Sequence, residues 1–283
     1  MTNTSTSGGK VNLFIIGINK AGTSWLNFLL EQHPGIYMSQ LKEHYYFDNT
    51  YPAKLDEYHS YFPFEKDYWY YGESTHIYNQ SKEAANQIKE YCPDAKLFAI
   101  VRDPIQRLLS QYYFQKQTGV LKENTTLEEV LADPNSPLIR ESHYEKSLPV
   151  YQRIFGDEQF KVVSLEHAKD DLHGVWKELQ TYLRLDPIPF PESQSKSENA
   201  TGSKLFRLLY RLTIRPIKVN NPKLYGTLLQ NKFMHKSKAI LLNLLGTAKK
   251  EKLSEELEAK LKAEFVPTYA YLNTLDFGDT YKS

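Results

Sequence analysis

A glycine-bearing segment near the start of the chain has the residue types that bind a phosphate or sulfate group. The apolar run Val11 to Ile16 ends at Gly17 and leads into Lys20-Ala21-Gly22-Thr23-Ser24-Trp25, which continues as a plausible helix to Leu30. In a strand–loop–helix unit, inward backbone N–H groups and the positive helix end hold an anion. We therefore expect an anion site with Lys20 as its cation. The alternative is a plain turn in which Thr23 or Ser24 caps the helix.

The spacing of Gly17 and Gly22 matches a Walker A loop, but Thr23 stands where that motif has lysine. A second candidate contact is Arg102, which follows the apolar run Lys96 to Val101. A guanidinium at the carboxyl end of a strand can fork onto a phosphate, and Ser110 could donate to the same group. The alternative for Arg102 is an ion pair with Asp103 or a neighbouring carboxylate.

Three short apolar runs define the expected architecture: Val11 to Ile16, Lys96 to Val101 and Phe160 to Leu165. Segments of helical length and polarity separate them, and Tyr68 to Gly72 is a possible fourth strand. This alternation predicts an α/β fold with a parallel sheet flanked by helices, and ligands at the carboxyl ends of the strands. Near the end of the chain, apolar residues recur every fourth position from Leu253 to Phe265, which predicts a helix that Pro267 ends.

Composition limits the function classes. The 283 residues are 41% hydrophobic and 24% charged, which is typical of a globular protein. The net charge of +1 argues against nucleic acid as a partner. Cys92 is the one cysteine, so no internal disulfide framework is possible. We expect a disordered tail over residues 1–10 and a single domain over 11–283. No export signal or membrane span is visible, so we expect a cytoplasmic protein.

Taken together, the two anion motifs resemble those of the sulfotransferases that use 3′-phosphoadenosine 5′-phosphosulfate (PAPS). In that family a Lys-x-Gly-Thr-Ser/Thr loop holds the 5′-phosphosulfate, and an arginine followed eight residues later by serine holds the 3′-phosphate. The resemblance covers roughly the first 115 residues. It implies a P-loop-like three-layer fold, PAPS as co-substrate, and no metal. The implied contacts are the loop residues Lys20 to Trp25, together with Arg102 and Ser110.

The segment Lys42-Glu43-His44-Tyr45-Tyr46-Phe47-Asp48 resembles the Lys-Glu-x-x-Phe-Phe-Asp of the glycan-modifying, heparan-sulfate-type branch. That resemblance implies Glu43 as the base that removes the acceptor's proton. Other branches use histidine, so the adjacent His44 stays an alternative. Lys20 would stabilise negative charge on the departing nucleotide. Glu73-Ser74-Thr75 resembles the Glu-Lys-Ser/Thr of the same branch, but the lysine is absent.

Weaker signals follow the second motif. Ser142-His143-Tyr144 falls where the family often has an acceptor-cleft Gly/Ser-x-Tyr, and Lys204 falls in the place of a later cofactor loop. The basic and apolar stretch 205–234 is either a lid, a docking face or a solvated helix. The expected function is sulfuryl transfer to a hydroxyl of a small molecule, lipid precursor, glycan or carrier-tethered acyl chain. A P-loop kinase-like phosphotransferase and a non-catalytic nucleotide-binding protein remain alternatives.

Overall fold

The computed structural model describes residues 9–133, 135–191, 253–278 and 280–281. The chain divides into two compact units, one formed by residues 1–107, 141–196 and 265–283 and the other by residues 108–140 and 197–264. Lys204, the stretch 205–234 and most of the expected N-terminal tail lie outside the described residues. The single domain over 11–283 stays a prediction.

A five-stranded parallel sheet forms the centre of the first unit. Its strands are β1 (Leu13–Gly17), β2 (Ile36–Met38), β3 (Tyr70–Ser74), β4 (Lys96–Val101) and β5 (Phe160–Ser164), in the order β2-β3-β1-β4-β5. The sequence predicted β4 with these bounds and the other long strands to within two residues. It did not predict β2. The expected parallel α/β sheet is confirmed.

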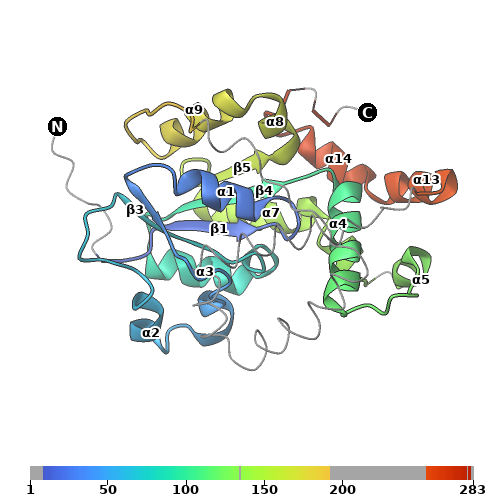
Figure 1. The fold of residues 1–283 in the computed structure, drawn as a ribbon, viewed down its shortest axis with the longest axis horizontal. Helices are drawn as coiled ribbons and strands as arrows, with labels where there is room; N and C mark the ends of the chain where they lie inside the picture. The colour runs from blue at the N-terminus through green and yellow to red at the C-terminus, as the bar shows by residue number, and fades with distance from the viewer. Residues whose placement is uncertain (1–8, 134, 192–252, 279, 282–283) are drawn as a thin grey trace, which may run out of the picture. The chain divides into compact units, whose positions relative to one another are not determined.

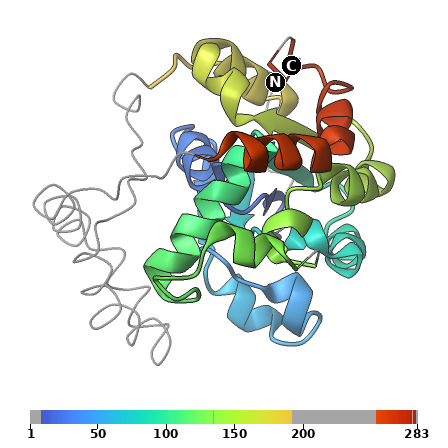
Figure 2. The same ribbon diagram turned by 90° about the vertical axis from the view of Figure 1, so that its right-hand side faces the viewer.

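Helices cover both faces of this sheet (Figure 1). The crossover helix α1 (Thr23–Leu30) lies on one face with α9 (Leu172–Tyr182), whereas α3 (Lys82–Tyr91) and α7 (Tyr144–Phe155) pack together on the other. Figure 2 shows α1 and α3 on opposite sides of the sheet. The shorter elements of this unit are the π-helical turn Tyr46–Thr50, α2 (Leu55–His59), the 3₁₀ turn Tyr78–Gln80, α8 (Leu165–Asp170) and α14 (Val266–Leu272).

The hydrophobic core of the first unit is built on the buried apolar strands of the sheet. Every residue of β1 is buried, and β4 is buried from Leu97 to Val101, as expected for central strands covered on both faces. Helix α3 adds its apolar stripe, which includes Ala84, Ala85 and Ile88. Each fully buried valine, leucine, isoleucine or phenylalanine side chain contributes about 1.5–3 kcal/mol to stability. The result is a rigid sheet whose carboxyl edge carries the loops.

The second unit is helical where it is described. Helix α4 (Pro104–Thr118) begins in the first unit and continues into the second, which also contains α5 (Leu127–Leu131), α6 (Pro137–Arg140) and α13 (Glu255–Glu264). A capping box between Thr126 and Glu129 starts α5. None of the described helices combines the length and the apolar character that a membrane crossing requires.

The expectation for Pro267 was wrong in one respect. Helix α13 ends at Glu264, but Pro267 stands in the first turn of the next helix, α14, instead of ending the helical pattern. Proline is tolerated there because the first N–H groups of a helix have no intrahelical acceptor.

Candidate active site

The strand order brings the candidate segments to one edge of the sheet. Parallel strands have their carboxyl ends at the same edge, and β3, β1, β4 and β5 are consecutive neighbours. The residues after β1 are the glycine loop, and the residue after β4 is Arg102. Glu43 joins this edge because its N–H donates to the carbonyl of Ser74, the last residue of β3, at 3.0 Å. Segments far apart in the sequence thus meet at one site.

The loop after β1 has the backbone shape of an anion cradle. Gly17, Lys20 and Gly22 have φ values of 144°, 66° and 118°, in the left-handed range. A Cβ on Gly17 would lie 2.7 Å from the carbonyl oxygen of His76, so only glycine fits between these segments. The N–H of Ile18 donates to the carbonyl of Ile100 at 3.1 Å, which fixes the start of the loop to β4.

The first turn of α1 contains backbone N–H groups that have no acceptor in the described residues. The N–H groups of Trp25 and Leu26 donate to the carbonyl of Gly22, at 2.9 and 3.1 Å, and no side chain caps the helix. Within the described residues, no hydrogen bond uses the N–H of Thr23 or Ser24. Two backbone donors at the positive end of a helix dipole are therefore available to an anion. This geometry favours the anion site over the capped turn.

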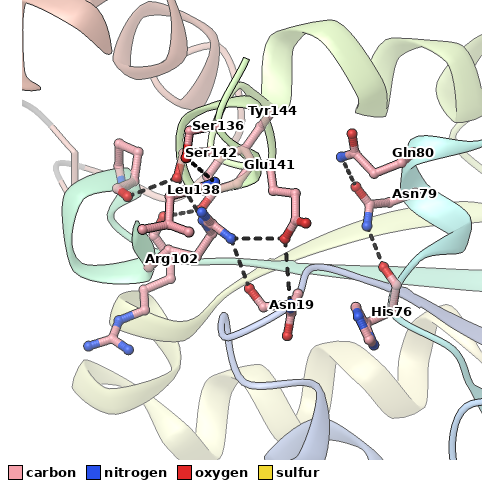
Figure 3. Close-up of polar contacts among 12 residues, drawn as sticks. Asn19, His76, Asn79, Gln80, Arg102, Ser136, Leu138, Glu141, Ser142 and Tyr144 are labelled. Carbon is pink, nitrogen blue, oxygen red and sulfur yellow. Dashed lines mark hydrogen bonds and ion pairs between the residues drawn. The ribbon is translucent and has the colours of Figure 1, made fainter. Parts of the chain in front are cut away.

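The buried side chain of Arg107 donates a hydrogen bond to the loop just before Lys20. The Arg107 side chain is fully buried, and its Nε donates to Oγ of Ser142 at 2.6 Å. Its Nη1 donates to the carbonyl of Asn19 at 3.4 Å and to Oε2 of Glu141 at 3.3 Å. Nδ2 of Asn19 also donates to Glu141, at 3.5 Å, and Figure 3 shows Asn19, Glu141 and Ser142 gathered in this network. The peptide preceding Lys20 is thereby fixed in orientation.

Arg102 lies beyond the end of β4, and its nearest carboxylate belongs to α8. Its Nε is 3.9 Å from Oε1 of Glu166, so the carboxylate partner is Glu166 and not Asp103. This Nε is buried and makes no hydrogen bond within the described part of the chain. Figure 3 shows the Arg102 guanidinium extending away from the cluster around Asn19. A guanidinium held by one long ion pair retains capacity for a further anion.

Glu43 pairs with His76, a histidine that no sequence motif predicted. Oε2 of Glu43 lies 2.6 Å from Nδ1 of His76 and also accepts the backbone N–H of His76 at 3.1 Å. The two side chains are 29% and 26% exposed, so both can reach a ligand at the edge. His76 follows Glu73-Ser74-Thr75 directly. The sequence motif ends at Thr75, one residue before His76, and nothing in the sequence links positions 43 and 76.

The other candidate base, His44, points into an aromatic cluster. Its ring packs against Tyr58, Tyr61 and Phe62, and its Nε2 lies 2.8 Å from Oγ of Ser39. Burial lowers the pKa of His44 to about 4, against a hydrogen bond to the backbone of Leu41 that raises it. The imidazole is therefore neutral and engaged in packing.

Glu73 is a completely buried carboxyl group at the end of β3. Its Oε1 accepts the hydroxyls of Tyr58 and Tyr78, at 2.9 and 3.3 Å, and its Oε2 accepts that of Thr75 at 2.7 Å. Burial nevertheless raises the pKa of Glu73 to about 7. Oγ of Ser74, where the sulfotransferase motif has lysine, is buried without a hydrogen-bond partner in the described residues. These hydrogen bonds fix the Glu73 side chain near the end of β3.

The structure also describes three weaker candidates from the sequence, Ser110, His143 and Tyr144. Ser110 lies on the part of α4 that belongs to the second unit, whereas Arg102 belongs to the first, so their joint role stays a prediction. His143 is the residue before α7, and its Nδ1 lies 2.8 Å from Oε1 of Glu145. Tyr144 is buried and donates to the carbonyl of Arg102 at 2.9 Å. Among the described residues, no three His, Cys, Asp or Glu side chains gather in a way that could hold a metal ion.

The chain is similar in sequence to known sulfotransferases. The family model described as "Sulfotransferase domain" matches residues 10–271. A membrane-associated sulfotransferase, kil1, of Dictyostelium discoideum is 33% identical over 109 residues, which cover 38% of this chain and 23% of that protein. The heparan sulfate glucosamine 3-O-sulfotransferase 5 of Homo sapiens is 31% identical over 185 residues, which cover 61% of this chain and 53% of that protein. The chain thus spans about half the length of these curated relatives or less.

A solved structure supports the architecture. A sulfotransferase from Alicyclobacillus acidocaldarius superposes with a TM-score of 0.57 at 23% identity, covering 85% of this chain and 97% of that one. At this identity the likeness establishes the shared α/β fold.

Proposed function

The chain belongs to the sulfotransferase domain family, and on that premise we propose that it transfers a sulfuryl group from PAPS to a hydroxyl group of an acceptor. One observation carries the proposal. The loop that contains Lys20 follows β1, and the segment that contains Glu43 follows β2 and donates a hydrogen bond to the end of β3, the strand between them. Gly17 of the loop in turn contacts the carbonyl oxygen of His76, which follows β3. An anion cradle and a group that can bind a proton are thus side by side, as sulfuryl transfer requires.

The residues present fit such a co-substrate. The available N–H groups of Thr23 and Ser24, with Lys20 beside them, suit the 5′-phosphosulfate. Arg102, whose Nε has no hydrogen-bond partner in the described residues, suits the 3′-phosphate. Ala21, Gly22 and Trp25 complete the proposed loop contacts. Ser110 and Lys204 are further proposed contacts that rest on the motif resemblance.

When bound, PAPS supplies an electrophilic sulfuryl group on a nucleotide leaving group. We assign to Lys20 the stabilisation of negative charge that develops on the bridging oxygen. The N–H groups at the start of α1 orient the sulfuryl oxygens for in-line attack. Arg107 keeps the loop in this shape by donating to the carbonyl of Asn19. The protein's own cations and dipoles provide the countercharge, so no metal is required for this assignment.

The acceptor's proton must be removed as its oxygen attacks sulfur. We assign this task to the position of Glu43 in preference to His44. The Glu43 side chain is partly exposed at the carboxyl edge, whereas the His44 ring is packed among aromatic side chains. A base must reach its proton within hydrogen-bond distance, and a ring engaged in packing does not.

Membership of the sulfotransferase domain family does not favour the two alternative functions, a kinase-like phosphotransferase and a protein that only binds nucleotide. The named relatives include enzymes that act on heparan sulfate glucosamine, so we propose a glycan hydroxyl as the first acceptor class to test. Small phenols, hydroxylated lipids and carrier-tethered hydroxyacyl chains are the other classes.

Calorimetry with the product nucleotide PAP tests the co-substrate. We expect PAP to bind with micromolar or tighter affinity in the presence of EDTA, and ATP with Mg²⁺ to bind much more weakly. The reverse order would support the kinase-like alternative. A mass-spectrometric screen with PAPS and one acceptor from each class tests the transfer itself. Tight PAP binding without any sulfated product would indicate a non-catalytic nucleotide-binding protein.

A further inference from the structure

Two carboxylates adjoin Arg102, those of Asp103 and Glu166, and within the described residues neither forms a hydrogen bond with its guanidinium. The register of β4 and β5 pairs Val101 with Ser164, so Arg102 and Glu166 follow neighbouring strand ends. The Nε of Arg102 nevertheless stays 3.9 Å from Oε1 of Glu166. A buried guanidinium nitrogen without an acceptor needs an explanation, because arginine and a carboxylate normally approach to about 2.7–2.9 Å.

The carboxylate of Glu166 is held by other donors. Its Oε2 accepts the hydroxyl of Tyr281 at 2.7 Å and the backbone N–H of Asp103 at 3.3 Å. Oε1 is the oxygen nearest to Arg102, so neither of these hydrogen bonds comes from the guanidinium. The Tyr281 hydroxyl and the Asp103 N–H therefore fix where the carboxylate stands.

Tyr281 is itself fixed by its surroundings. Its side chain is 6% exposed and packs against Phe277, with 6.0 Å between the ring centroids. Its hydroxyl oxygen lies 2.8 Å from Oγ of Ser164, the N-cap of α8, and this Oγ accepts the N–H of His167 at 3.0 Å. Because the Tyr281 proton goes to Glu166, Ser164 is the donor in its contact with Tyr281. Burial and the charge of Glu166 raise the pKa of Tyr281, so the hydroxyl keeps its proton and remains a donor.

A second tyrosine, Tyr269 of α14, holds Asp103 in the same way. Its hydroxyl donates to Oδ2 of Asp103 at 2.6 Å, and Oδ1 accepts the backbone N–H of Gln106 at 2.8 Å. Burial and the hydrogen bond to Asp103 raise the pKa of Tyr269, which keeps this hydroxyl protonated as well. The backbone between the two carboxylates is fixed too, since the carbonyl of Arg102 accepts the hydroxyl of Tyr144 at 2.9 Å.

The position of Glu166 decides what Arg102 can bind. A carboxylate that forks onto a guanidinium uses its N–H donors and neutralises its charge. At 3.9 Å, Glu166 leaves the N–H donors of Arg102 open, although its charge still favours one orientation of the side chain. The Arg102 side chain is 19% exposed, so an anion can reach it from solvent.

We propose that Tyr281 is a positioning residue for the co-substrate: its hydroxyl holds Glu166 away from Arg102 and so keeps the guanidinium open to the 3′-phosphate. This inference rests on the proposed function. Tyr269 does the same for Asp103. Neither tyrosine needs to touch the nucleotide, because both act through a carboxylate. Without the Tyr281 hydroxyl, Glu166 is free to close on Arg102, where it occupies the donors and repels the phosphate.

Calorimetry with PAP and adenosine 5′-phosphate tests the proposal in the full chain. Tyr281→Phe removes the hydroxyl but keeps the ring. PAP affinity should fall about tenfold, the lower end of the range for one lost hydrogen bond to a charged group, while adenosine 5′-phosphate affinity stays within about twofold. Tyr70→Phe is the matched control and should bind both nucleotides normally. The Tyr70 hydroxyl donates to the carbonyl of Leu183 at 2.9 Å, and Tyr70 begins β3, at the amino end of the strand.

A second substitution separates this role from a merely structural one. Glu166→Gln removes the charge that Tyr281 restrains, so Tyr281→Phe should have little effect on PAP affinity in the Glu166→Gln background. A tyrosine that only packs would weaken PAP by the same factor in both backgrounds, and it would weaken adenosine 5′-phosphate as well. Either result would overturn the proposal.

Nitrogen NMR of the arginine side chains tests the arrangement without nucleotide. The Nε–H signal of Arg102, assigned as the one that Arg102→Lys lacks, should shift in Tyr281→Phe as a hydrogen bond to Glu166 forms. In the Glu166→Gln background, Tyr281→Phe should cause no such shift. An unchanged signal in Tyr281→Phe would overturn the proposal and leave the proposed transfer intact. If the wild-type chain does not prefer PAP to adenosine 5′-phosphate, the proposed co-substrate is wrong instead, so the two failures are distinguishable.

Discussion

The guanidinium of Arg107 donates to the backbone carbonyl of Asn19, the residue immediately before Lys20. This contact joins the first turn of α4 to the anion loop, and Glu141 accepts from both side chains. A fully buried arginine with three different acceptors is costly to disrupt, because its partners are left without donors. The shape of the loop thus depends on a residue that does not itself need to touch the co-substrate.

Arg107→Ala should therefore lower the free energy of unfolding by about 3 kcal/mol, the scale for removing one partner of a buried ion pair. PAP affinity should fall with it, since the Asn19 peptide loses its anchor. Arg184→Ala is the matched control, because its pair with Glu158 has side chains that are 76% and 83% exposed. Chemical denaturation and calorimetry measure the two quantities. Equal stability of the two variants would refute the anchoring role.

Glu73 should make the folded protein less stable as the pH rises from ~4.5 to ~7. Burial raises the pKa of Glu73 to about 7, so the folded state holds the proton more tightly than the unfolded chain. The contribution is complete below pH ~4.5, falls between ~4.5 and ~7, and is lost above that range, with a total on the order of 3 kcal/mol. Glu73→Gln should remove this dependence in denaturation curves recorded across pH; an unchanged slope would count against it.

His44 should act in the opposite direction. Burial lowers the pKa of His44 to about 4, so the unfolded chain binds a proton before the folded state does. Stability from this group is present above pH ~6.5 and is lost as the pH falls toward ~4. In the wild-type chain the effects of Glu73 and His44 partly cancel between these values. His44→Gln should therefore expose the falling slope of Glu73, and Glu73→Gln the rising slope of His44.

The same His44→Gln variant tests the choice of base. Because the ring packs among aromatic side chains, the substitution should change stability but leave turnover of the folded protein within a few-fold. Turnover and circular dichroism are measured on one sample, so that loss of fold is not mistaken for loss of chemistry. A fall of 10²-fold or more in a folded His44→Gln would return the base to His44.

Arg102 should distinguish nucleotides by their 3′-phosphate. Arg102→Ala should weaken PAP binding by about 1.5–3 kcal/mol, the range for a lost hydrogen bond to a charged group. Binding of adenosine 5′-phosphate, which lacks the 3′-phosphate, should change little. Calorimetry with both nucleotides measures the difference, and an equal loss for both would assign Arg102 to another part of the ligand.

The sequence predicted those parts of the fold that depend on local pattern. The apolar run of β4 and the strand–loop–helix unit around Gly22 are readable because period and glycine position are local properties. Strand β2 was missed because three residues, Ile36–Met38, carry too little pattern. Pro267 was misread because a proline that ends one helix and one that begins the next have the same local signal.

The site was predictable only in part, since its contacts are not local. The positions of Lys20 and Arg102 at strand ends follow from the motifs, whereas Glu43 follows β2, a strand that the sequence did not predict. The partner of Glu43 is His76, which becomes its neighbour because β2, the strand before Glu43, pairs in parallel with β3, the strand before His76. Likewise, Arg107 lies between Arg102 and Ser110 in the sequence, but its complete burial depends on packing among distant segments. Such relationships appear only once the sheet order is known.

The transfer of isotope-labelled sulfate from PAPS tests the central claim most directly. With EDTA present, the wild-type chain should move the label to a hydroxyl of one acceptor class and form one PAP for each sulfated product. Lys20→Ala, which removes the proposed cation from the loop, should lose both transfer and much of the PAP affinity. If the label stays in PAPS with every acceptor class, or if transfer is unaffected by Lys20→Ala, the account is contradicted.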